Sequence, residues 1–214
     1  MNVQQYFSTP FLHTNIDDLH FCAEIEKFIL TSMNEKNEVK DAPQSAHPDL
    51  FESEFNFLNW NVSQTNQLKK ILLNYLFEFI QEVNHFTQAE LQKIRFIHES
   101  WFHVAKSGGY FQNHTHPNHS WSMVLCVNPG SNQEENEFEQ GKLVFWDPRG
   151  NASMFLDEAN GRMKRPYAFS GFKIKPGKGS LLIFPSYLQH AVEPYRGDDY
   201  RITVAANFRF NIDE

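Results

Sequence analysis

The fold is decided by residues 176–190, which read PGKGSLLIFPSYLQH. A glycine- and proline-rich turn comes first, followed by the apolar run 180–184. A Pro185-Ser186 turn then leads to His190, which opens another apolar segment. Short apolar runs between turn residues are typical of β-strands. The stretch therefore predicts two strands joined by a sharp turn, with a histidine at the start of the second.

The same sequence pattern extends from about residue 93 to the end of the chain. Turns rich in Gly, Pro, Asn and Asp separate short β-like runs. We expect strands at 95–105, 120–127, 142–146, 168–175, 180–184, 191–195 and 200–210. Strands of this number and spacing are typical of a jelly roll or β-sandwich.

The N-terminal part reads as helical. Apolar residues recur with helical period after Asp17-Asp18 and again from Leu68 to Val83, with Ser63 as the expected N-cap of the second helix. An irregular connection is expected between them, at 34–60. The prediction is a mainly β protein flanked by two or more helices. Residues 1–92, an N-terminal strand and helices, pack on the sheet, and residues 93–214 form the core of the same domain.

Composition limits the possible functions. The 214 residues carry a net charge of −7, and an acidic chain is a poor match for the phosphate backbone of nucleic acids. No apolar run reaches the ~18 residues of a membrane span. Two cysteines are too few for a disulfide framework, and a cytoplasmic protein is expected.

Three histidines form a candidate metal site. His114 and His116 project to the same face of an extended chain, because strand side chains alternate. His190 is the candidate for the third ligand. His119 and Asn118 remain alternatives, although His119 lies on the opposite face if the chain stays extended.

A candidate anion clamp follows the last histidine. Arg201 lies on a strand rich in apolar residues, where burial of a charge is costly unless an anion pairs with it. Thr203 and Asn207 share its face. Arg201 could instead pair with Asp198, Asp199 or a glutamate of the acidic loop 131–140, so a ligand carboxylate is one of two interpretations.

The order His-x-His, Gly141-Lys142-Leu143, Pro176-x-x-Gly179, His190 and Arg201-x-Thr203 resembles the 2-oxoglutarate- and Fe(II)-dependent oxygenase superfamily. It is most similar to a group of small members with a His-x-His-Pro element, over roughly residues 95–210. The resemblance implies a cupin-like double-stranded β-helix. It also implies that His114, His116 and His190 hold the metal, and that Arg201 and Thr203 bind the far carboxylate of 2-oxoglutarate.

His116 departs from the family pattern. Most members have Asp or Glu at its position, giving the two-His, one-carboxylate site of non-haem iron. A neutral imidazole leaves the full charge on the metal, so the site could also host another metal such as Zn.

The resemblance implies a dioxygenase that hydroxylates an unactivated C–H with release of succinate and CO2, from 2-oxoglutarate, O2 and an unidentified substrate. No catalytic residue is expected beyond the metal centre. The alternatives are a three-His cupin-type dioxygenase that works without 2-oxoglutarate and a non-catalytic metal-binding jelly roll. A homodimer through edge strands stays open. Substrate contacts are expected among Asn207, Gln112, Trp121, His103 and Arg149.

Overall fold

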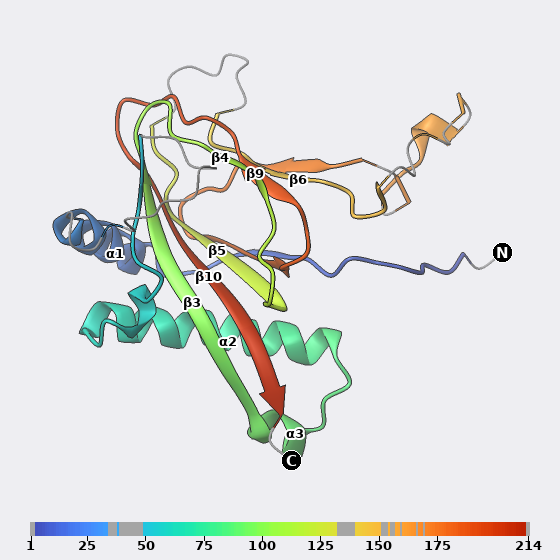
Figure 1. Ribbon diagram of the computed structural model, residues 1–214, viewed down its shortest axis with the longest axis horizontal. Helices are drawn as coiled ribbons and strands as arrows, with labels where there is room; N and C mark the ends of the chain where they lie inside the picture. Colours follow the sequence, from blue (N-terminus) through green and yellow to red (C-terminus); the bar gives the residue numbers. More distant parts are fainter. Residues whose placement is uncertain are drawn as a thin grey trace.

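The computed structural model describes residues 3–33, 38, 49–131, 140–150, 154, 157–158, 160–165, 167–168 and 170–212. Two antiparallel sheets form its framework (Figure 1). The larger has six strands in the order β1(Leu12–Asn15), β8(Ser180–Pro185), β5(Trp121–Asn128), β10(Arg201–Ile212), β3(Ile94–Ala105) and β2(Leu50–Glu52). The smaller has four, in the order β4(Phe111–His114), β9(His190–Val192), β6(Leu143–Phe145) and β7(Phe172–Ile174).

Helices cover the face of the large sheet that points away from the small one. They are α1(Leu19–Ser32) and α2(Ser63–Val83), and α2 lies across the sheet in Figure 1. The short α3(Gln88–Lys93) leads directly into β3 at one end of the sheet. The Asp18 side chain caps α1 by accepting a hydrogen bond from the backbone N–H of Phe21. Ser63, the expected cap of α2, is instead its first residue, and the capping position belongs to Val62.

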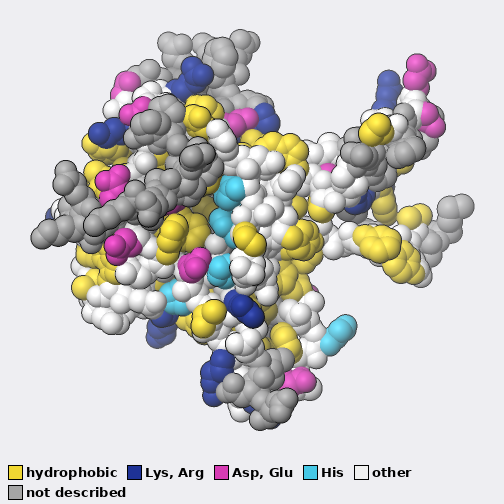
Figure 2. Space-filling model, viewed as in Figure 1, with side chains coloured by type: hydrophobic (Ala, Val, Ile, Leu, Met, Phe, Trp, Pro, Cys, Tyr) yellow, Lys and Arg dark blue, Asp and Glu magenta, His cyan; other side chains and the backbone are white. Residues whose placement is uncertain are grey.

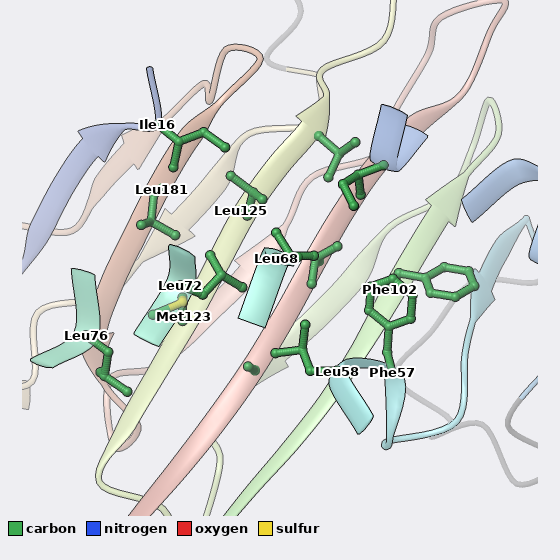
Figure 3. Packing of buried hydrophobic residues seen from close by; sticks show 14 of the residues in the cluster. Ile16, Phe57, Leu58, Leu68, Leu72, Leu76, Phe102, Met123, Leu125 and Leu181 are labelled. Atoms are coloured by element: carbon green, nitrogen blue, oxygen red, sulfur yellow. The ribbon is translucent and has the colours of Figure 1, made fainter. Parts of the chain in front are cut away.

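The main core lies between these helices and the large sheet (Figure 3). The apolar stripe of α2 supplies Leu68, Leu72 and Leu76, which meet Met123 and Leu125 of β5. Fully burying a Leu, Met or Phe side chain stabilises a fold by about 1.5–3 kcal/mol. A smaller cluster between the two sheets contains Leu143, Phe145, Leu182, Phe184 and Leu188.

The predicted fold class, mainly β with helices on one side, is confirmed. All seven predicted strands have counterparts, although β6, β7 and β9 have only three residues each. The strand β1 lies in the region where an N-terminal strand was expected, whereas β2, β4, the 3-10 turns η1(Phe57–Asn59) and η3(Asn160–Arg162), and α3 were not predicted. The main core takes residues from both sides of position 92/93, and the division there stays a prediction. None of the described helices is long and apolar enough to cross a bilayer.

Two features of the topology position the candidate site. The strand β10 lies between β5 and β3, with Thr203 opposite His103 on one side and Cys126 on the other. In the small sheet, β4 pairs with β9 so that His114 is directly opposite His190. The turn after β4 is fastened to the turn before β9, because the backbone N–H of His116 donates to the carbonyl of Ser186.

Candidate metal centre

Three imidazoles converge where the small sheet faces the large one. The ring centroid of His114 lies 4.2 Å from that of His190 and 4.9 Å from that of His116, and the third separation is 5.1 Å. One nitrogen from each ring lies within 4.8 Å of the others. The structure thus brings together residues separated by 74 positions in the sequence, as the motif predicted.

Backbone carbonyls fix the orientation and the tautomer of two of the imidazole rings. Nδ1 of His114 lies 2.7 Å from the carbonyl oxygen of Gln112, and Nδ1 of His190 lies 2.8 Å from that of Leu188. A carbonyl oxygen can only accept, so Nδ1 carries the proton in both rings. The lone pair then resides on Nε2, which is free to bind a metal.

Aromatic side chains wall the three histidines. Phe111 contacts the ring of His114, Trp101 that of His116, and Phe145 and Phe184 that of His190. Burial and repulsion from the neighbouring histidines lower the pKa of His116 to about 2 and that of His190 to about 3. Burial also lowers the pKa of His114. All three imidazoles are therefore neutral at neutral pH, the form in which histidine binds metals.

Arg201 is a buried cation without a counter-ion among the described residues. Its side chain is 4% exposed, and its Nη2 atom has no hydrogen-bond partner. Asp199, one of the alternative partners, instead accepts hydrogen bonds from the hydroxyl of Tyr195 and the backbone N–H of Ser131. The loop glutamates, the other alternative, lie outside the described residues. Gly141 packs against the aliphatic part of the Arg201 side chain, because a Cβ on this glycine would lie 3.0 Å from Cδ of Arg201. An isolated buried charge is costly, which indicates space for an anion.

The polar residues of β10 that follow Arg201 are also buried. Thr203 is 3% exposed, and so is Asn207. The hydroxyl of Ser122 donates to Oδ1 of Asn207 at 2.8 Å and lies 2.9 Å from the hydroxyl of Ser186. Because Oδ1 is held in this way, the NH2 group of Asn207 is left to donate into the site.

A pocket of about 320 Å3 opens beside His116. Its walls come from β3, β10 and the turn after β4, and are formed by Ile97, Glu99, His116, Pro117, Asn118, His119, Asn207 and Arg209. In the view of Figure 2, histidine side chains form a row near the middle of the molecule, with acidic and basic side chains beside them. His119 lies outside the metal cluster and faces Glu99 at 3.9 Å. A molecule in this pocket would therefore sit against a candidate metal ligand.

The other four residues that were expected to contact the substrate do not lie together in the structure. His103 lies beside the cluster, where its ring contacts that of Phe111. Gln112 reaches His114 through its backbone carbonyl, while its side chain is exposed. Trp121 packs on Phe79 of α2, on the opposite face of the sheet from the histidines. Arg149 is exposed and pairs with Asp147. Of these four, only His103 and the Gln112 backbone contact the site.

Glu52 is a residue that the sequence did not reveal. It is 3% exposed, and its Oε2 lies 2.6 Å from Nε2 of His103. Its other oxygen has no hydrogen-bond partner among the described residues. It comes from the three-residue strand β2, inside the segment expected to be irregular, where no periodic pattern could have indicated it.

Comparison with known proteins identifies the family. A family model described as "Putative 2OG-Fe(II) oxygenase" matches residues 99–207, more than half of the chain. No curated protein gives a significant sequence match. The matched segment contains all three histidines, Arg201, Thr203 and Asn207.

Solved structures of low sequence identity share the fold. A prolyl-4-hydroxylase from Pseudomonas putida is 12% identical, with a TM-score of 0.63 over 94% of this chain and 93% of that one. A Trichoplax adhaerens prolyl hydroxylase, solved with a hypoxia-inducible-factor peptide, is 13% identical, with a TM-score of 0.59 over 94% and 84%. HygX from Streptomyces hygroscopicus, solved with nickel and 2-oxoglutarate, is 9% identical, with a TM-score of 0.58 over 94% and 82%.

Enzymes of this family use 2-oxoglutarate and O2 together with a further substrate. The family match covers the histidine cluster and the buried arginine, and the shared fold extends over nearly the whole chain. The chain belongs to the 2-oxoglutarate- and Fe(II)-dependent oxygenases.

Proposed function

We propose that His114, His116 and His190 hold Fe(II), and that Arg201 and Thr203 bind 2-oxoglutarate, so that the enzyme hydroxylates a C–H bond of a substrate placed beside His116. The observation that carries this proposal is the buried guanidinium of Arg201, whose Nη2 has no hydrogen-bond partner among the described residues, in the same molecule as a three-histidine cluster. Either feature alone fits several functions. Together they match a metal and a dianion.

The donor set fits a divalent metal. Three neutral imidazoles supply three nitrogen ligands and no charge, so the bound ion keeps its full positive charge. The carbonyls of Gln112 and Leu188 orient two of the ligands, as outer partners do in metalloproteins. A dianionic cosubstrate compensates this charge better than a neutral one. The replacement of the usual carboxylate by His116 is therefore compatible with 2-oxoglutarate.

Arg201 and Thr203 supply the second half of the cosubstrate site. A guanidinium binds a carboxylate with two parallel hydrogen bonds, and a hydroxyl two residues along the strand lies on the same face. Both side chains are buried, which excludes water from competition for the carboxylate. This pair favours a 2-oxoglutarate enzyme over a three-His cupin-type dioxygenase, which needs no such clamp.

When bound, Fe(II) and 2-oxoglutarate supply the oxidising chemistry, with succinate and CO2 as by-products. The protein binds and orients the metal, the cosubstrate and the substrate. Phe111, Phe145 and Phe184 exclude water around the ligands. Asn207 offers its NH2 group to the cosubstrate or the substrate, and Ser122 fixes its orientation. Trp121 and Arg149 have no part in this site.

The proposal is tested by anaerobic titration of the purified protein with Fe(II) and 2-oxoglutarate. A weak visible charge-transfer band is expected, since 2-oxoglutarate would bind the iron directly. His190→Ala should abolish the band. The matched control is His85→Ala, which changes an exposed histidine that follows α2 and should leave the band intact.

Each failure has its own meaning. No band with the wild type would remove the cosubstrate from the proposal. A band that survives His190→Ala would remove this histidine from the ligand set. If oxygen is then admitted, succinate should accumulate in proportion to the 2-oxoglutarate consumed; iron binding without succinate would favour the non-catalytic jelly roll.

A further inference from the structure

The pocket beside His116 carries two opposite charges that do not pair with each other. Glu99 of β3 and Arg209 of β10 both line it. The Glu99 side chain is 55% exposed, and its one ion pair among the described residues is a long contact of 3.9 Å with His119. Arg209 has no hydrogen-bond or ion-pair partner in the part of the chain that the structure describes. The pocket thus offers a carboxylate and a free guanidinium.

Strand register sets the spacing of these two charges. Glu99 is directly opposite Asn207, and Arg209 is directly opposite Ile97. Glu99 and Arg209 are therefore diagonal neighbours on one face of the sheet, about 7–8 Å apart at the backbone. Their flexible side chains can approach a small molecule from two sides. A ligand that bears an ammonium and a carboxylate on the same carbon can satisfy both.

The same register gives the distance to the metal centre. Trp101 contacts the ring of His116 with centroids 5.8 Å apart, and it is two residues along β3 from Glu99. Two residues of an extended strand span about 6.6–6.8 Å. A ligand whose charged head lies between Glu99 and Arg209 would reach the metal with a chain of a few carbon atoms.

Pocket size limits the ligand further. A volume of about 320 Å3 is at the lower end of small-molecule sites, which span ~300–1000 Å3. A ligand with only an anionic group would be repelled by the carboxylate of Glu99. A ligand with only a cationic group would be repelled by the guanidinium of Arg209. An internal residue of a peptide has neither a free ammonium nor a free carboxylate on its α-carbon.

We infer that the substrate is a free α-amino acid. Glu99 binds its α-ammonium, Arg209 binds its α-carboxylate, and its side chain extends along His116 toward the metal. This inference rests on the proposed function for the reaction itself, but the binding that it requires can be measured without turnover.

The test measures amino-acid binding to the protein loaded with Zn(II) and 2-oxoglutarate, in which no oxidation occurs. Each of the twenty common L-amino acids is titrated by calorimetry, together with its N-acetyl and carboxamide derivatives. At least one amino acid should bind, and both of its derivatives should bind at least tenfold more weakly. In the Fe(II) enzyme, the same amino acid should accelerate succinate formation.

Two substitutions test the assigned contacts. Arg209→Gln should raise the Kd of the amino acid by about 10- to 100-fold, because a charge-assisted bidentate contact is lost. Glu99→Gln should raise it by about tenfold. The matched controls are Arg162→Gln in η3 and Glu78→Gln in α2, both exposed and outside the pocket, and these should change the Kd less than twofold.

The outcomes separate this inference from the proposed function. If the charge-transfer band forms but no amino acid binds, or if a bound amino acid is insensitive to Arg209→Gln, the inference fails and the oxygenase stands. Equal binding of an N-acetyl derivative also overturns it and points to a peptide substrate. If amino acids bind but no band forms, the cosubstrate assignment fails instead.

Discussion

The two faces of β10 contrast sharply. Ile202, Val204, Ala206 and Phe208 point to the helices and join the main core. Arg201, Thr203 and Asn207 alternate with them on the opposite face of the sheet and are also buried, and Asn207 lines the pocket. One face is therefore filled with hydrocarbon, while the other holds a charge, a hydroxyl and an amide.

This contrast distinguishes side chains whose burial stabilises the fold from side chains whose burial prepares a site for a ligand. On the helix side, each side chain meets other side chains of the protein. On the site side, Nη2 of Arg201 has no partner among the described residues, so its burial raises the free energy of the folded chain. Substitutions on the two faces should therefore have opposite consequences for stability and for binding.

The largest effect on stability is expected on the helix face. Phe208→Ala removes a fully buried ring from the main core and should lower the free energy of unfolding by about 3–5 kcal/mol. Chemical denaturation measures this change. The Kd of 2-oxoglutarate for the protein that remains folded should stay within twofold; a much larger loss of binding would mean that the two faces are not independent.

The site face should show the reverse. Arg201→Met keeps the volume but removes the charge, and should raise the Kd of 2-oxoglutarate by about 100-fold, since the partner of a buried carboxylate is lost. The free energy of unfolding without 2-oxoglutarate should stay constant or rise, because an unpaired buried charge is gone. Calorimetry and denaturation measure the two quantities. A strong destabilisation, with metal lost as well, would show that Arg201 is structural.

A smaller effect is expected at Gly141, which has a φ of 63° and lies against Arg201. Gly141→Ala adds a Cβ about 3.0 Å from Cδ of Arg201 in a left-handed backbone conformation. We expect a loss of ~1 kcal/mol in stability and a few-fold rise in the Kd of 2-oxoglutarate. The same assays apply, and unchanged binding would mean that the guanidinium is not held in place by this contact.

The smallest effect on function is expected at Trp121. Trp121→Phe retains an aromatic ring against Phe79 of α2 and should change the rate of succinate formation less than twofold. A tenfold loss with normal stability would bring Trp121 back to the substrate site, where the sequence had suggested it.

Local periodicity explains what could be predicted from the sequence. The spacing of two between His114 and His116, and between Arg201 and Thr203, places each pair on one face of an extended chain. Turn residues around 176–190 indicated that His190 would open a strand, and β9 begins there. Likewise, the helical period of the apolar residues in α2 predicted both the helix and the face of it that is buried.

Long-range pairing explains what could not be predicted. No local pattern specifies that Trp121 is opposite Phe208, so its position on the helix face follows only from the register of β5 and β10. Glu52 meets His103 because the short strand β2 pairs with β3. Likewise, Glu99 and Arg209 are 110 positions apart, and only the register of β3 with β10 makes them neighbours.

The most direct test of the account is a crystal grown anaerobically with Fe(II) and 2-oxoglutarate, with anomalous scattering recorded on both sides of the iron edge. One iron peak is expected within bonding distance of a nitrogen of each of His114, His116 and His190, with the far carboxylate of 2-oxoglutarate on Arg201. An iron bound elsewhere, or a carboxylate that leaves Arg201 unpaired, would contradict it.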